Sequence, residues 1–109
     1  MPSTIRGSDN LDSGKVTGKT KTWQDVTASR ALATSYTNSN DYEIWVNVVT
    51  GATTAQTCTA TVAGQTLQGS SFSSSGNNTA IMFPVPPGAS YQVNNIGTSP
   101  SLVSWKEYK

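Results

Sequence analysis

The acidic side chains are the first candidates for chemistry, because a pair of carboxyl groups can act as the acid and base of a glycosidase. Asp41 and Glu43 are separated by one residue, which on a β-strand would place them on one face, about 7 Å apart. Asp41, however, lies in the segment TNSND, where Asp typically bonds to its own turn backbone. We therefore interpret both as solvated or turn-capping groups, and we predict no catalytic residues.

Other catalytic and metal-binding chemistries lack their usual residues. The chain contains no histidine, which removes the commonest general base, the Ser-His-Asp triad and the commonest transition-metal ligand. Cys58 is the single cysteine and alternates with threonines, so we predict a small buried side chain rather than a reactive thiol. Neither a phosphate-binding glycine motif nor an acidic calcium-loop motif occurs. We expect no enzyme activity, no cofactor and no metal.

Length and charge narrow the remaining classes. The chain has 109 residues with a net charge of +1, which predicts one domain. Its seven basic residues are scattered, so no basic stripe is available for nucleic acid. No apolar run approaches the roughly 18 residues of a membrane span, and the start does not resemble a secretory leader. We expect a protein made in a cytoplasm whose work is binding and assembly.

Two groups of residues are candidates for binding. Trp45 faces opposite Tyr42 and Ile44 on a predicted strand, so that strand needs a second covering surface, either a neighbouring subunit or a lid formed by the N-terminal segment or a loop. Phe72 lies in the polar segment GSSFSSSGNN, where it either folds back on the core or binds ligand together with short hydrogen-bonding side chains. The candidate ligand-binding residues are Tyr42, Trp45, Phe72, Asn77 and Asn78.

The elements that must position these residues follow a period of two. Segments such as YEIWVNVVT and TCTATVAG alternate between two faces, which is typical of half-buried antiparallel strands. Turn signals recur about every ten residues, and TASRALATS has the only hint of helix, one turn at most. We predict an all-β fold, an antiparallel β-sandwich of jelly-roll type. Its eight strands are expected near 21–27, 30–36, 42–49, 55–63, 65–71, 78–85, 89–95 and 102–108.

Two segments need separate interpretation. NTAIMFPVP (78–86) is apolar on both sides, which suggests a central strand or a subunit contact, whereas Pro84 lacks an N–H and suggests an edge or a bulge. Pro86-Pro87-Gly88 then predicts a sharp corner. Residues 1–21 fit neither period, so we predict an extended attachment arm, with Ile5 and Leu11 as its anchors on a neighbour, or else a loose terminus. Residues 22–109 are predicted to form the sandwich.

Three stretches, 22–48, 83–93 and 101–108, together resemble the small β-sandwich domain that ends many bacteriophage tail-fibre and related virion proteins. That domain opens with Trp-x-Asp-Val, continues with R-x-L-x-x-x-Y-x-N, turns at PPG-x-x-Y and closes with W-x-E. STIRGSDN (3–10) also resembles the segment that often precedes it. The matching residues here are Trp23, Asp25, Val26, Arg30, Leu32, Tyr36, Asn38, Pro86, Pro87, Gly88, Tyr91, Trp105 and Glu107.

The resemblance implies a virion protein of tail-fibre type, a homotrimer, attachment to the host surface and no catalysis. Its expected partners are further copies of itself, other virion proteins held through the arm, and host-surface polysaccharide. Typical fibres carry a long stalk before this domain, whereas about 20 residues precede it here. The alternative is therefore a capsid- or neck-bound decoration or head-fibre protein with a purely structural role.

Overall fold

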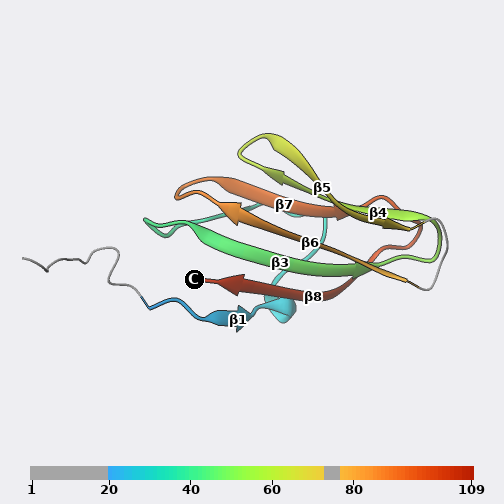
Figure 1. The fold of residues 1–109 in the computed structure, drawn as a ribbon, viewed down its shortest axis with the longest axis horizontal. Helices are drawn as coiled ribbons and strands as arrows, with labels where there is room; N and C mark the ends of the chain where they lie inside the picture. The colour runs from blue at the N-terminus through green and yellow to red at the C-terminus, as the bar shows by residue number, and fades with distance from the viewer. Residues whose placement is uncertain (1–19, 73–76) are drawn as a thin grey trace, which may run out of the picture.

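The computed structural model describes residues 20–72 and 77–109, which form an all-β sandwich (Figure 1). Most of the predicted arm, including Ile5 and Leu11, lies outside the described residues. The described part contains eight strands and one short 3-10 turn. In chain order they are β1 (Trp23–Asp25), η2 (Thr27–Ser29), β2 (Tyr36–Thr37), β3 (Ile44–Gly51), β4 (Gln56–Val62), β5 (Gln65–Phe72), β6 (Asn78–Val85), β7 (Ser90–Asn95) and β8 (Ser101–Tyr108).

The strand pairing follows a single rolled-up hairpin. Each strand pairs antiparallel with its counterpart from the other half of the chain: β1 with β8, β2 with β7, β3 with β6, and β4 with β5. Rolling this long hairpin adds the contacts of β3 with β8 and of β4 with β7. The result is two four-stranded sheets, β1-β8-β3-β6 and β2-β7-β4-β5, seen as lower and upper layers in Figure 1. This topology is the jelly roll, so the predicted fold class is confirmed.

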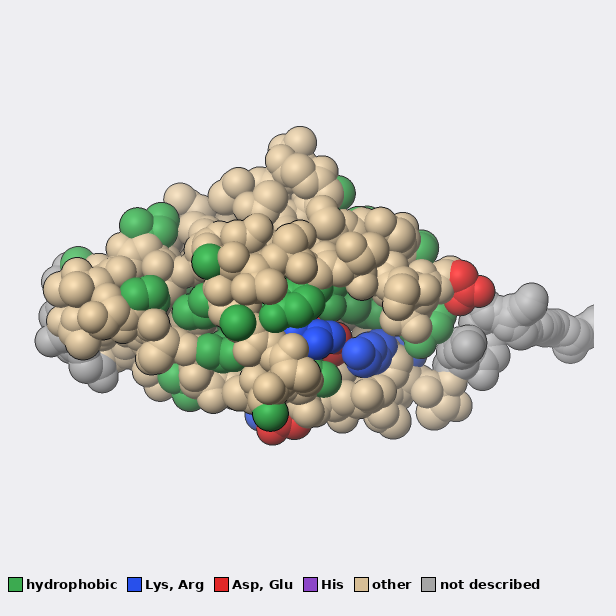
Figure 2. Space-filling model, turned by 180° about the vertical axis from the view of Figure 1, so that it is seen from behind, with side chains coloured by type: hydrophobic (Ala, Val, Ile, Leu, Met, Phe, Trp, Pro, Cys, Tyr) green, Lys and Arg blue, Asp and Glu red, His purple; other side chains and the backbone are tan. Residues whose placement is uncertain are grey.

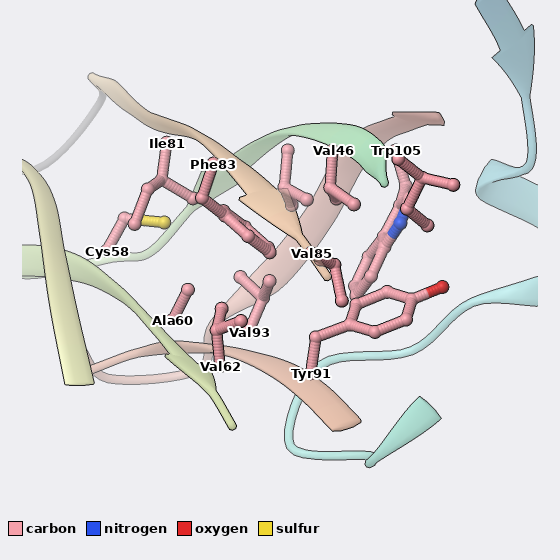
Figure 3. Close-up of a cluster of buried hydrophobic side chains, with 12 residues drawn as sticks. Val46, Cys58, Ala60, Val62, Ile81, Phe83, Val85, Tyr91, Val93 and Trp105 are labelled. Carbon is pink, nitrogen blue, oxygen red and sulfur yellow. The ribbon is translucent and has the colours of Figure 1, made fainter. Parts of the chain in front are cut away.

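The alternation of side chains along the strands builds the core between the two sheets. In β3, Ile44, Val46 and Val48 are at most 1% exposed, whereas Trp45 and Asn47 point to the outer face. Burying one such aliphatic side chain stabilises the fold by about 1.5–3 kcal/mol. Figure 3 shows Tyr91 and Trp105 at one end of this core and Cys58 and Ile81 at the other. The other buried hydrophobic residues are Ala60, Val62, Phe83, Val85 and Val93.

The strand predicted over residues 30–36 is wrong, because β2 contains only Tyr36 and Thr37. Ala33 adopts the left-handed conformation, with φ of 58°, and a residue in that region cannot continue an extended strand. Its N–H instead donates to the carbonyl of Val93 at 2.9 Å. The single helical turn expected in TASRALATS is present as the 3-10 turn Thr27–Ser29.

The corner at Pro86-Pro87-Gly88 is held by a buried asparagine. Gly88 has a φ of 77°, a conformation that glycine adopts at little cost. The side-chain amide of Asn38 donates to the carbonyl oxygens of Tyr42, Val85 and Pro86 at 2.9, 3.1 and 3.2 Å. The Gly88 N–H donates to the Asn38 carbonyl at 2.9 Å. Asn38 therefore ties the corner to the turn that precedes β3.

β5 and β6 are edge strands of the two sheets, and a contact between them joins the sheets along one side of the sandwich. β6 is an edge strand, so the expectation of an edge from Pro84 is confirmed and the central position is excluded. The hydroxyl of Ser70 accepts from the Ala80 N–H at 2.8 Å. A Cβ at Gly69 would lie only 2.5 Å from the Ala80 carbonyl oxygen. The two edges therefore approach so closely that only glycine fits there.

Candidate functional site

A buried carboxylate joins the two sheets at one end of the core. Glu107 is fully buried and receives the Nε and Nη2 groups of Arg30 at 3.2 and 3.1 Å. The Tyr91 hydroxyl and the Trp105 indole N–H donate to its Oε2 at 2.8 and 2.9 Å, and the Lys109 ammonium lies 3.1 Å from Oε1. In Figure 2, Lys and Arg side chains gather beside a band of hydrophobic side chains, with little acidic surface visible.

The surroundings of the cluster lower the pKa of Glu107 and raise the pKa of Tyr91. Burial by itself would raise the pKa of the Glu107 carboxyl, but the hydrogen bonds from Arg30, Tyr91, Lys109 and Trp105 outweigh burial and hold it below its ordinary value. Burial, followed by the hydrogen bond to the Glu107 carboxylate, raises the pKa of Tyr91 to about 12. Glu107 is thus a charged, hydrogen-bonded anchor of the fold rather than a proton donor facing a substrate.

A second polar network lies at the opposite end of the core. The Asn95 amide donates to the Thr50 hydroxyl and to the Gln56 side-chain oxygen at 2.8 and 2.9 Å, and the hydroxyls of Thr50 and Thr79 are 2.7 Å apart. Cys58 is buried beside these threonines, and burial raises the pKa of its thiol. The prediction of a buried cysteine is confirmed, and a protonated thiol is a poor nucleophile.

The acidic pair considered for catalysis is exposed at the start of β3. Asp41 and Glu43 both precede the first residue of that strand and lie on the surface. Within residues 20–72 and 77–109, no three His, Cys, Asp or Glu side chains are grouped to hold a metal ion.

The outer face of the β1-β8-β3-β6 sheet carries a row of aromatic side chains, here called the aromatic row. Trp23 pairs with Tyr108, and Tyr108 pairs in turn with Trp45. Residues directly opposite in antiparallel strands project from the same face, so these three residues occupy one row across β1, β8 and β3, which Pro84 of β6 extends. The ring centroids of Trp23 and Tyr108 are 5.2 Å apart. Trp23 and Trp45 remain 48% and 37% exposed.

Polar side chains border the aromatic row on both sides. On one side Asp25 pairs with Lys106, and Lys106 pairs with Asn47. On the other side the Lys21 ammonium donates to the Glu43 carbonyl at 2.8 Å and lies 5.9 Å from the centre of the Tyr108 ring. The row is therefore an apolar strip between groups that can form hydrogen bonds.

A separate hollow lies near the start of β4 and the end of β5. It is open, has a volume of about 550 Å³, and presents two exposed apolar side chains, Phe72 and Ile96. The hydroxyls of Thr57 and Ser71 are 2.7 Å apart on its wall. The lining residues are Ala55, Gln56, Thr57, Ser71, Phe72 and Ile96.

The structure separates the predicted binding residues into two groups. Phe72, Asn77 and Asn78 lie near one another, since Gln56 pairs with Phe72 and donates to the Asn77 carbonyl at 2.6 Å. Trp45 lies six residues from Gly51, the partner of Asn78, which is about 20 Å along a strand.

Tyr42 is partly buried and packs against the core. It is therefore not grouped with either surface. Trp45, by contrast, faces outward as predicted. The prediction that a neighbouring subunit, the N-terminal segment or a loop covers Trp45 stays a prediction.

Trp23, Tyr108 and Ile96 were not among the predicted binding residues. Trp23 and Tyr108 each stand in an alternating segment, which indicates a face but not a neighbouring strand. Their meeting depends on β8 lying between β1 and β3, which no local pattern encodes.

Comparison with family models, with curated proteins and with solved structures gives no significant match. No helix in the described part of the chain is long and apolar enough to cross a membrane.

Proposed function

We propose that this protein is a structural component of bacteriophage particles, of tail-fibre type, that assembles as a homotrimer and contributes to attachment to the host surface. The observation that carries the proposal is the convergence of the three stretches that resemble the tail-fibre domain. Arg30 comes from the first stretch, Tyr91 from the second, and Trp105 and Glu107 from the third, and all four meet in one hydrogen-bonded cluster.

Other residues of the resemblance belong to the same framework. The Tyr36 ring packs at 6.0 Å from Tyr91 and at 5.6 Å from Trp105. Asn38 binds the Pro-Pro-Gly corner. These residue types at these separations are thus explained as partners in one structural unit, which supports treating the resemblance as a single pattern rather than as chance matches.

The fold is compatible with the proposal without deciding it. Jelly rolls occur in viral capsid proteins and in lectins, and a fold by itself does not define a function. The attachment role rests on the two surfaces that expose aromatic side chains, the aromatic row and the hollow beside Phe72. The proposal assigns the protein to the virion and gives it no catalytic step.

Two measurements test the proposal. Light scattering of the purified chain should give the mass of a trimer, and electron microscopy with an antibody against the chain should label phage particles. Particles without label would contradict a virion role, and a monomer would contradict the trimer.

A decoration protein with a purely structural role is the competing function, and variants separate it from attachment. Deleting residues 1–18 should abolish incorporation into particles under both functions. If the protein attaches to the host, Phe72→Ala or Trp45→Ala should reduce binding to cells while incorporation persists. If it is structural only, both variants should incorporate and adsorb as the unchanged particle does.

A further inference from the structure

We propose that the aromatic row binds a neutral, linear polysaccharide that lies across the strands of the β1-β8-β3-β6 sheet. The inference rests on the proposed attachment function, and it assigns the chemistry of the ligand and the surface that holds it. The spacing of the rings, their exposure, the polar borders of the row and the balance of charge support it.

The spacing of the rings is set by the sheet. Neighbouring strands lie about 4.8 Å apart, and the centroids of Trp23 and Tyr108 are 5.2 Å apart. This separation is close to the length of one pyranose unit along an extended glycan. Trp23 and Tyr108, whose ring planes are tilted by 42°, can therefore contact two successive sugars, because the apolar C–H face of a sugar packs well on an aromatic ring. Trp45, which pairs with Tyr108 on the next strand, offers a third ring further along the same chain of sugars.

The exposed area favours a narrow ligand over a second protein. An aromatic side chain offers about 150–250 Å², so three partly exposed rings present on the order of 300 Å², well below the roughly 800 Å² that each partner contributes to a stable protein interface. A larger interface would have to bury Asp25 and Lys106, which lie in the next row, and charged residues are depleted from interface cores. A single glycan chain needs only the strip itself.

The borders of the row supply hydrogen-bonding groups for sugar hydroxyls. Asp25, Lys106 and Asn47 line one side, and Lys21 with the backbone carbonyl of Glu43 lines the other. Sites of this kind combine an apolar surface with a few polar groups that set orientation.

The charges along these borders cancel. Two lysines, Lys21 and Lys106, and two exposed acidic residues, Asp25 and Glu43, stand at the borders, so the formal charges of these four described residues sum to zero. Hydrogen bonds from Thr27, and after them the charge of Lys106, lower the pKa of Asp25, whereas Lys21 donates to the backbone carbonyl of Glu43. A polysaccharide that carried a carboxylate or phosphate on every repeat would find no excess of positive charge here. The structure therefore points to an uncharged polymer.

Native electrophoresis of the full chain in gels that contain dextran, amylose, mannan, galactan or hydroxyethyl cellulose tests the inference, with alginate as the acidic comparison. At least one neutral polymer should retard the protein, and Trp45→Ala or Trp23→Ala should weaken that retardation about tenfold. Trp45→Phe, which keeps a ring, should retain most of it. Trp23 and Trp45 lie on the row whereas Trp105 is buried, so tryptophan emission should shift with the same polymer.

Met82→Ala is the matched control, because Met82 is 56% exposed on the same face but lies opposite Asn47, one row away. It should bind as the unchanged protein does. Retardation by no neutral polymer, retardation by alginate alone, or equal losses in the Met82 and Trp45 variants would overturn the inference. So would a Trp45→Ala variant that alters only the oligomeric state, since that result assigns the row to a second copy.

The failures of the inference and of the proposed function are distinguishable. Particles that contain the labelled chain but adsorb equally well with Trp45→Ala would remove the aromatic row as the attachment surface and leave the virion role intact. Glycan binding at the row by a protein that labels no particle would instead contradict the virion role.

Discussion

The guanidinium of Arg30 grips the carboxylate of Glu107 through two parallel hydrogen bonds of 3.2 and 3.1 Å, although the two residues are 77 positions apart. Arg30 precedes β2 and Glu107 lies near the end of β8, so the pair joins the two halves of the rolled hairpin. Bidentate pairs of this kind combine strength with a defined geometry. The pair is therefore a sensitive point for testing how the fold is held together.

Replacing Arg30 tests the value of that geometry. Arg30→Ala should lower the free energy of unfolding by about 3 kcal/mol, because a buried carboxylate loses its bidentate partner. Arg30→Lys should recover only part of the loss, since an ammonium lacks the planar fork. Urea unfolding provides the measurement, with Lys106→Ala on the exposed face as a control expected within about 0.5 kcal/mol. A loss at Arg30 no larger than at Lys106 would show that Lys109, Tyr91 and Trp105 suffice.

The stability should fall in acid because of Glu107. The folded state holds the pKa of this carboxyl below its ordinary value, so its contribution is complete above the unfolded pKa of about 4.3 and is lost as the pH falls through the lower folded value. Urea midpoints between pH 7 and pH 2 measure the effect. Glu107→Gln should be less stable at pH 7 and show a flatter acid limb. Parallel acid limbs in both proteins would assign the loss to other carboxyl groups.

Asn38 should be the critical residue of the Pro-Pro-Gly corner. Asn38→Ala leaves the carbonyls of Tyr42, Val85 and Pro86 without their donor, which should cost about 2–4 kcal/mol. Asn38→Asp should cost at least as much, because a carboxylate oxygen would then face those carbonyls. Thermal unfolding measures both, and exposed Ser39→Ala serves as the neighbouring control. If Asn38→Ala matches Ser39→Ala, the prolines alone determine the corner.

The seam between β5 and β6 should not accept a methyl group. In Gly69→Ala the new Cβ would lie 2.5 Å from the Ala80 oxygen and 2.9 Å from the Ile81 Cβ, so the edges must separate, at a cost of about 1–3 kcal/mol. Faster hydrogen exchange at the Ala80 amide, which now bonds to Ser70, should accompany the loss. Ser70→Ala is the companion variant. It removes that bond without a clash and should speed exchange with a smaller loss of stability.

Much of the fold was predictable because its signals are local. A period of two in residues 42–49 identified a strand and placed Trp45 opposite Ile44, and Pro84 indicated the edge on which β6 lies. The strand predicted over residues 30–36 does not form over residues 30–35, because Ala33 adopts the left-handed conformation and its N–H donates to the Val93 carbonyl. Nothing in the residues near Ala33 signals that partner, which lies 60 positions further along the chain.

The aromatic row and the hollow beside Phe72 likewise combine features that were predictable from the sequence with features that were not. Alternation was enough to show that Trp45 faces outward. The polar segment around Phe72 left two possibilities open, a ring that folds back on the core or one that binds ligand, and the structure places Phe72 partly exposed. The composition alone shows that the chain contains no histidine. Side-chain direction along a strand is set by the backbone of that strand alone, which is why the direction of Trp45 needed no tertiary information.

Which residues become neighbours was decided only by the tertiary structure, in which the long hairpin is rolled into two sheets. Trp23, Tyr108 and Trp45 form one row because β8 lies between β1 and β3, and Glu107 meets Arg30 and Tyr91 because the same rolling brings both sheets together. Strand order follows from burying two apolar faces against each other over the whole chain. That is a collective balance of burial against chain entropy, so no short segment contains it.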